Sequence, residues 1–143
     1  MKLVLFNDGR PGLLTDGGVI DVGQVVGPAG GGQEAMESII TRMDDLRAEL
    51  SRLEKDGDAI PLSNVALQPP LPNPGKILCM GGNFTEFGHR SPGPMWGFLK
   101  STEAVIGPGG TVILPPDDAN IFHHEAELVL VFGRAGKDVK EEE

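Results

Sequence analysis

A proline-rich segment, residues 68–75 with the sequence QPPLPNPG, divides the chain into two parts of different character. Proline fixes the backbone φ angle and holds a chain extended, so this composition is typical of a semi-rigid linker. We therefore predict an N-terminal domain over residues 1–70, a linker over residues 71–75 and a second domain that begins at residue 76. The chain has 143 residues, which is enough for one compact domain or two small ones.

The N-terminal region begins with short apolar runs joined by turn residues. Residues 2–6, 12–15 and 19–22 are suited to strands, and the turn residues between them predict a small antiparallel meander. A glycine-rich run, residues 27–32, follows, and such a run before a helix can bind phosphate. No Gly-Lys-Ser/Thr follows it, however, and Glu34 would repel phosphate from the first helical turn. A flexible connector is the favoured interpretation.

Residues 33–55 carry the clearest helical pattern in the chain. Their apolar residues recur three and four positions apart and form one stripe: Met36, Ile39, Ile40, Met43, Leu46, Leu50 and Leu53. We predict one long helix that Gly57 closes. Similar spacing occurs in coiled coils, but this run spans less than three heptads. Packing of the stripe on its own domain is therefore favoured, and pairing with another chain is the alternative.

Composition and charge limit the partners of this chain. Its formal net charge of −9 would repel a nucleic-acid backbone or an anionic membrane surface. No apolar run approaches the roughly 20 residues of a membrane span, and the N-terminus lacks the apolar core of a signal peptide. We expect a soluble, cytoplasmic protein that binds neither nucleic acid nor membranes. Its single cysteine, Cys79, lies in an apolar run, which favours a buried, inert thiol over a catalytic nucleophile.

After the linker the sequence favours β-structure. Short apolar runs at residues 76–80, 103–106, 111–114 and 126–132 are separated by Gly and Pro and predict strands. The predicted fold class is α+β, mainly β. It consists of a small N-terminal domain with a β-hairpin and a helix, followed by the first part of a mixed β-sandwich or roll over residues 76–143.

Two glutamates near the start of the last apolar run are candidate metal ligands. Side chains alternate between the two faces of a strand, so Glu125 and Glu127 would share one face, about 6.6 Å apart along the strand. Two carboxylates in this arrangement repel each other unless a cation lies between them or one is protonated. Their oxygen atoms suit Mg²⁺, Mn²⁺ or Ca²⁺. The alternative is a solvated strand end whose charges prevent edge pairing.

The two histidines before this pair, His123 and His124, raise the question of a zinc site. Neighbouring residues of a strand face opposite ways, so these histidines and Glu125 cannot easily share one ion. Ordinary strand histidines are the favoured interpretation.

Five segments of the second part occur in an order that is typical of one enzyme family. They are residues 77–84 (ILCMGGNF), 97–101 (GFLKS), 104–109 (AVIGPG), 112–115 (VILP) and 124–128 (HEAEL). In their order and spacing the chain resembles the fumarylacetoacetate hydrolase family, in its bacterial branch of acylpyruvate hydrolases and 2-hydroxyhepta-2,4-diene-1,7-dioate isomerases. The resemblance is specific over residues 74–143 and holds only in outline over residues 1–70.

The resemblance implies a metal-dependent hydrolase of 2-oxo acids that cleaves a C–C bond in acylpyruvates and related 1,3-dicarbonyl compounds. Glu125 and Glu127 match the family's Glu-x-Glu metal ligands, and the family typically holds Mg²⁺ or Mn²⁺, which chelates and polarises the substrate. Lys100 would lie near the site, and an exposed strand-end lysine is the alternative. Asn83 would shape the substrate pocket, with a plain turn residue as the alternative. A homodimer is expected for the complete enzyme.

Two departures from the family pattern bear on hydrolysis. The family's His–Glu dyad, which activates water as a general base, falls on Phe87 and Arg90 in this chain. The nearby ionisable residues Glu86 and His89 are offset candidates for the same role, and a lid histidine without catalytic duty is the alternative for His89. The family's third metal carboxylate, an Asp, and a further substrate-binding lysine would come after Glu143. The sequence therefore resembles an N-terminal part of the enzyme, which we expect to be inactive alone.

Two alternatives to hydrolysis stay open. A decarboxylase or isomerase of 2-oxo acids from the same family would need no water-activating dyad. A non-catalytic interaction module would instead use its acidic surface and the apolar stripe of residues 36–53 to bind a partner. In that case Glu125 and Glu127 form only a solvated edge.

Overall fold

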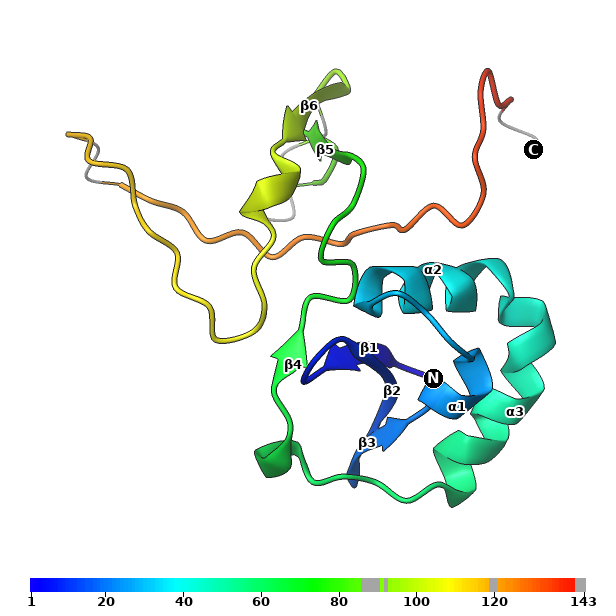
Figure 1. Cartoon of the computed structure of the whole chain (residues 1–143). Coiled ribbons are helices and arrows are strands. Elements are labelled where there is room, and N and C mark those ends of the chain that lie inside the picture. The colour runs from blue at the N-terminus through cyan, green and yellow to red at the C-terminus, as the bar shows by residue number, and fades with distance from the viewer. Residues whose placement is uncertain (86–90, 92, 119–120, 141–143) are drawn as a thin grey trace.

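The computed structural model describes residues 1–85, 91, 93–118 and 121–140. Its N-terminal part is a four-stranded antiparallel sheet with helices packed against it (Figure 1). The strand order is β3-β2-β1-β4, with β1 at Leu3–Phe6, β2 at Arg10–Thr15, β3 at Gly18–Asp21 and β4 at Leu67–Gln68. The helices are α1 (Gly23–Val26), α2 (Gly32–Thr41) and α3 (Met43–Asp56). This arrangement confirms the predicted α+β class, and no helix of the described residues is long and apolar enough to cross a lipid bilayer.

The predicted meander forms because its turn residues adopt backbone conformations that most residues avoid. β1 and β2 are joined by a turn in which Asn7 and Gly9 have φ angles of 48° and 81°. Asn7 also ties the sheet to the chain before β4. Its backbone N–H donates to the Ala66 carbonyl at 2.8 Å, and the Ala66 N–H donates to the Asn7 Oδ1 atom at 2.9 Å. β2 and β3 are joined by a tight turn at residues 16–17, where turn residues were predicted to separate the two strands.

The glycine-rich run before α2 has a packing role. Gly32, the first residue of α2, lies directly against the β1–β2 turn. A Cβ atom on Gly32 would stand 2.8 Å from Leu5 Cδ1 and 3.0 Å from Gly9 Cα, so only glycine fits without displacing the turn. Further back in the run, the Gly30 N–H donates to Glu34 Oε2 at 2.6 Å. A carboxylate therefore already takes a donor that a phosphate would use, which agrees with a connector.

The prediction of one helix over residues 33–55 is wrong in one respect, because the segment forms two helices that meet at Arg42. The Arg42 backbone N–H donates to the Ser38 carbonyl at 3.0 Å, and its guanidinium donates to the Val26 carbonyl at 3.0 Å. A straight helix of this length would span about 35 Å, roughly the diameter of a small domain. The break at Arg42 instead lets both helices keep their apolar sides on one core.

The apolar stripe packs on the β1–β4 sheet of the same chain. Its buried members and the strand residues that they pack with are Met36, Ile39, Leu46, Leu50, Leu5, Leu13 and Ile20. The alternative of a stripe that pairs with another chain is therefore wrong for these residues. Gly57 ends α3 as predicted, and its N–H donates to the Leu53 carbonyl at 2.8 Å. Glycine is required there by packing, since a Cβ atom would stand 2.8 Å from Ile20 Cγ2.

Replacement of Gly12 by Ala is expected to lower the free energy of unfolding by about 1–3 kcal/mol, because it overpacks a filled site. Gly12 shares the other face of the sheet with Phe6 and Val19, which are both fully buried. The new methyl group would stand 2.5 Å from Val19 Cγ1 and 3.1 Å from Phe6 Cε1. Val19 is branched at Cβ and has little freedom to move away.

Urea denaturation measures this effect, and Gly75→Ala is the matched control, because no atom lies within 4 Å of its new methyl group. Equal midpoints for Gly12→Ala and the control would show that the sheet is not tightly packed at Gly12.

After the linker, β5 (Ile77–Gly81) and β6 (Trp96–Lys100) form a two-stranded antiparallel ribbon. β5 confirms the strand predicted at residues 76–80. Cys79 lies in β5 and is half-buried, so the prediction of a fully buried thiol is wrong. The reason is that a two-stranded ribbon does not enclose a core of its own.

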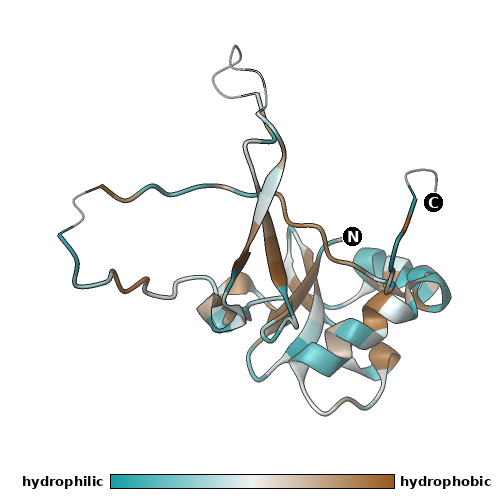
Figure 2. Cartoon of the chain, turned by 90° about the horizontal axis from the view of Figure 1, so that it is seen from above, coloured by the Kyte–Doolittle hydropathy of each residue, from teal (hydrophilic) through white to brown (hydrophobic). Residues whose placement is uncertain are grey.

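The strands predicted at residues 103–106, 111–114 and 126–132 are not formed. A short 3₁₀ helix, η2 (Thr102–Ala104), takes the place of the first. The other two segments form no strand pairing with a described residue. A strand forms only when a neighbour completes its backbone hydrogen bonds. The apolar side chains of the last segment stay exposed, with Phe132 exposed by 89%, and Figure 2 shows apolar residues along this part of the chain.

The linker lies against the N-terminal part. Leu71 packs on the buried core, and the Asn73 N–H donates to Gln33 Oε1 of α2 at 3.1 Å. The apolar core of the described residues lies before the linker, whereas the ribbon and the segments after it are largely exposed.

Candidate metal centre

Glu125 and Glu127 belong to residues 121–140, which form no helix or strand and are drawn as the orange to red trace in Figure 1. Both side chains are exposed, and neither carboxylate forms an ion pair with another described residue. Two such carboxylates, two residues apart, are open to a cation from solvent. That they share one face of a strand remains a prediction, because their segment is not paired into a sheet.

The chemistry of this pair fits a hard divalent cation in part. Carboxylate oxygens are the ligands that Mg²⁺, Mn²⁺ and Ca²⁺ prefer, and Mg²⁺ often takes only one or two carboxylates and keeps several waters. In the part of the chain that the structure describes, no group of three or more His, Cys, Asp or Glu side chains comes together. His123 and His124 therefore do not complete a set of metal ligands with the glutamate pair. Glu125 and Glu127 would hold an ion together with water or a substrate.

Lys100 is the last residue of β6 and pairs with Ile77 across the ribbon. Its Nζ atom lies 5.9 Å from the centroid of the Phe98 ring, within the range of a cation–π interaction. The side chain is exposed, so the ammonium group is available to an anion. This position agrees with the alternative of an exposed strand-end lysine, and a role at the metal centre remains a prediction.

Asn83 lies in the exposed loop after β5. It follows Gly82, whose φ angle is 67° and whose carbonyl accepts a hydrogen bond from the Gly93 N–H at 3.0 Å. Glycine allows the chain to turn at position 82, directly before Asn83, and a role of Asn83 in the substrate pocket remains a prediction. The candidate base residues Glu86 and His89 lie outside the described residues.

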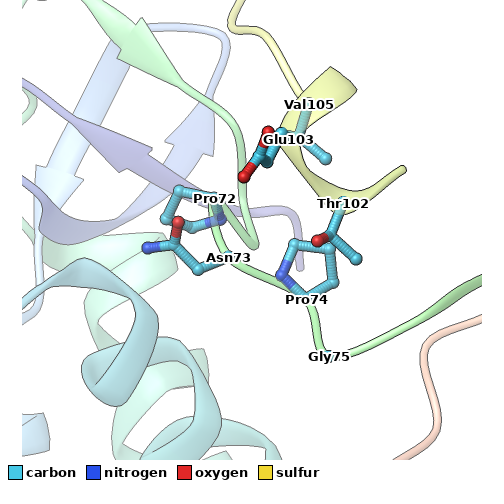
Figure 3. A pocket seen from close by; sticks show the side chains of 7 residues that line it. All are labelled: Pro72, Asn73, Pro74, Gly75, Thr102, Glu103 and Val105. Carbon is cyan, nitrogen blue, oxygen red and sulfur yellow. The ribbon is translucent and has the colours of Figure 1, made fainter.

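A hollow of about 410 Å³ opens between the linker and the segment that contains η2 (Figure 3). The residues that line it are Pro72, Asn73, Pro74, Gly75, Thr102, Glu103 and Val105. Glu103 is the one ionisable group in this lining, and none of the predicted site residues belongs to it. The hollow therefore offers no acid–base pair and is separate from the candidate metal ligands.

Two aromatic residues on β6 were not identified as candidates from the sequence. The rings of Trp96 and Phe98 stack with their centroids 5.5 Å apart and their planes at 27°. Because side chains alternate along a strand, both lie on the face of β6 that carries Lys100. The alternation Trp-x-Phe-x-Lys could have identified them, since it places every second residue on one face.

Residues 76–143 match the family model described as fumarylacetoacetate (FAA) hydrolase C-terminal. The chain is similar to the mitochondrial oxaloacetate tautomerase fahd2 of Xenopus laevis, with 31% identity over 68% of this chain and 32% of the relative. It is also similar to maleylpyruvate hydrolase of Aquipseudomonas alcaligenes, with 28% identity over 99% of this chain and 56% of the relative. The chain thus spans about a third of the length of the first relative and just over half of the second.

A solved structure of a maleylpyruvate hydrolase is also similar to this chain. The crystal structure of maleylpyruvate hydrolase from Sphingobium sp. SYK-6 in complex with manganese(II) and pyruvate matches with a TM-score of 0.68 and 28% identity. The match covers 81% of this chain and 43% of that chain. That relative binds manganese, a divalent cation of the class predicted for the glutamate pair.

Proposed function

The chain belongs to the fumarylacetoacetate hydrolase family, and we propose that it supplies metal-ligating carboxylates of a divalent-metal-dependent hydrolase that cleaves a C–C bond in acylpyruvates. The observation that carries this proposal is the pair Glu125 and Glu127, which lies inside the matched segment with both side chains exposed. Two similar proteins are maleylpyruvate hydrolases, and the solved one holds manganese and pyruvate. Mn²⁺ and Mg²⁺ are the cations that we propose.

Each candidate residue has a role that its chemistry allows. Glu125 and Glu127 would hold the cation, which when bound would polarise the carbonyl and carboxylate oxygens of a 2-oxo acid and offset the negative charge of the chain near an anionic substrate. The Lys100 ammonium pairs with a substrate carboxylate, and the Asn83 amide donates to a substrate oxygen. His89 and Glu86 are proposed as the water-activating base from their place in the sequence.

Hydrolysis then proceeds by addition of water to the acyl carbonyl carbon, while the base takes a proton from that water. The C–C bond between the acyl carbon and the pyruvate part breaks, and its electron pair passes to the pyruvate part as an enolate. Protonation of the enolate carbon gives pyruvate, and the acyl part leaves as a carboxylic acid.

A second candidate function is keto–enol isomerisation of a 2-oxo acid, which the similarity to an oxaloacetate tautomerase favours. Isomerisation moves one proton between carbon and oxygen and needs no attacking water. It is therefore compatible with Phe87 and Arg90 at the positions of the family's dyad. Products separate the two candidates, because hydrolysis of acetylpyruvate releases pyruvate and acetate, whereas isomerisation leaves the carbon skeleton intact.

Binding of pyruvate to the 143-residue chain is expected to require Mn²⁺. Equilibrium dialysis with labelled pyruvate measures the bound fraction with Mn²⁺, after addition of excess EDTA, and after Mn²⁺ is restored. We expect binding in the first and third conditions and none in the second. Binding that persists unchanged in EDTA, or no binding with saturating Mn²⁺, would contradict the proposed site.

A further inference from the structure

One face of the β5–β6 ribbon carries two stacked aromatic rings followed by an ammonium group. Trp96, Phe98 and Lys100 alternate along β6, and we call these three residues the aromatic platform. The two rings stack at 5.5 Å, and Lys100 Nζ lies 5.9 Å from the centroid of the Phe98 ring. The platform therefore places the Lys100 ammonium group next to the Phe98 ring, and the Phe98 ring next to the Trp96 ring.

Gly81, the last residue of β5, and Gly82 after it leave space for the indole. Gly81 pairs with Trp96, and a Cβ atom on Gly81 would collide with the six-membered part of the indole ring. A Cβ atom on Gly82 would lie 3.4 Å from the indole Nε1 atom. The ring thus rests on the backbone of β5 in a space that any other residue at position 81 would fill. This contact orients the platform before any ligand arrives.

The platform is open to solvent and locally positive. Trp96 is exposed by 57% and Phe98 by 42%, which is a large aromatic surface to leave in water. Among the described residues from 76 to 100, Lys76 and Lys100 are the charged side chains, and no carboxylate occurs there. The whole chain carries a net charge of −9, and the Lys100 ammonium group gives this face one side chain that attracts an anion.

We propose that the aromatic platform binds a flat, conjugated carboxylate, with its π-system against the rings of Trp96 and Phe98 and its charge paired with Lys100. A planar unsaturated chain stacks on aromatic faces, whereas a saturated chain puckers and has no π-system to stack. The platform thereby selects acylpyruvates whose acyl group is planar and unsaturated. This selection rests on the proposed function, while the binding of a flat carboxylate does not depend on it.

Three probes without a 2-oxo group test the platform in the presence of EDTA, so that the result does not depend on a metal ion. Cinnamate is flat and anionic, 3-phenylpropionate is anionic but not conjugated, and cinnamamide is flat but neutral. Trp96 is the only tryptophan of the chain, so its indole N–H gives one NMR reporter signal. Cinnamate is expected to shift this signal and to bind about twofold to tenfold more tightly than 3-phenylpropionate. It is expected to bind about twofold to fivefold more tightly than cinnamamide.

Two variants connect each preference to one side chain. Phe98→Leu keeps an apolar residue and is expected to remove most of the preference for cinnamate over 3-phenylpropionate. Lys100→Met keeps the apolar stem and is expected to remove the preference for cinnamate over cinnamamide. Lys76→Met is the matched control, because it also removes one positive charge but from a residue outside the platform, directly before β5. It is expected to keep both preferences. Each preference is a ratio of two dissociation constants measured on the same variant. Well-dispersed amide signals from the N-terminal sheet show that each variant is folded.

The outcomes separate this inference from the proposed function. Equal binding of the three probes, an unmoved indole signal, or preferences that persist in both platform variants would overturn it. Cinnamate selectivity that appears in EDTA while pyruvate fails to bind with Mn²⁺ would uphold the platform and contradict the metal site.

Discussion

Replacement of both Glu125 and Glu127 by Gln is expected to weaken Mn²⁺ binding by the chain strongly. Gln keeps the size of the side chain and one carbonyl oxygen but loses the charge that a hard divalent cation requires. No third His, Cys, Asp or Glu side chain gathers with this pair in the described ranges, so no group there can take over. We expect the affinity for Mn²⁺ to fall on the order of 100-fold, since ligand charge largely sets the affinity of such sites. Calorimetric titration, or the electron paramagnetic resonance signal of free Mn²⁺, measures this change.

The matched control removes the same charge from the same exposed part of the chain. Asp117 and Asp118 are exposed and precede the glutamate pair, and their joint replacement by Asn also removes two negative charges. Salt screens exposed charges that do not contact the ion more strongly than it weakens direct ligands. The control is expected to keep most of the affinity because neither Asp117 nor Asp118 is a proposed ligand. An equal loss in both double variants would mean that Mn²⁺ is held by diffuse charge and not by a site.

Replacement of Leu50 by Ala is expected to lower the free energy of unfolding by about 2–5 kcal/mol, because it leaves a cavity in a packed core. Leu50 is 0% exposed and lies in the cluster that joins α3 to the sheet. A small domain is stable by about 5–15 kcal/mol in total, so this loss would remove a large part of its stability. Urea denaturation followed by circular dichroism measures it as a lower midpoint with an unchanged slope.

Leu62→Ala removes the same atoms from a leucine that is 50% exposed, in the 3₁₀ helix η1 (Leu62–Asn64). Its expected effect is within about 0.5 kcal/mol, as for most surface substitutions. If Leu50→Ala and Leu62→Ala were equally mild, the stripe of α3 would not be part of the domain core. That result would reopen the possibility that the stripe binds another chain.

Much of the N-terminal part could be predicted from local sequence. The meander follows from apolar runs separated by Asn and Gly, because the conformations of Asn7 and Gly9 depend on neighbouring atoms in the chain. The helical stripe follows from spacing alone, since the period of a helix is a local property. The break at Arg42 was not predictable in the same way. It depends on the Val26 carbonyl and on a core shared with the sheet, which local spacing does not describe.

In the candidate site, too, some features could be predicted from the sequence and others depend on tertiary contacts. The glutamate pair and Lys100 could be selected from the order of segments in the sequence, before any strand was placed. The alternation Trp-x-Phe-x-Lys places Trp96 and Phe98 on one face from sequence alone, whereas the contact of the indole with Gly81 depends on the pairing of β6 with β5. The strand predicted around Glu125 and Glu127 has suitable apolar residues but lacks a partner among the described residues.

The sequence by itself determined where this chain turns, where it is helical and which residue types it offers to a cation. Each of these properties arises from contacts within a few residues or from side-chain chemistry. The tertiary structure decided which apolar runs became strands, where the long helix broke and which side chains became buried. These outcomes depend on backbone hydrogen bonds and packing between residues far apart in the chain, as in the pairing of Phe6 with Leu67. The carboxylates at 125 and 127 are thus predicted as ligands from the sequence, and their relative orientation would depend on a strand that pairs beside them.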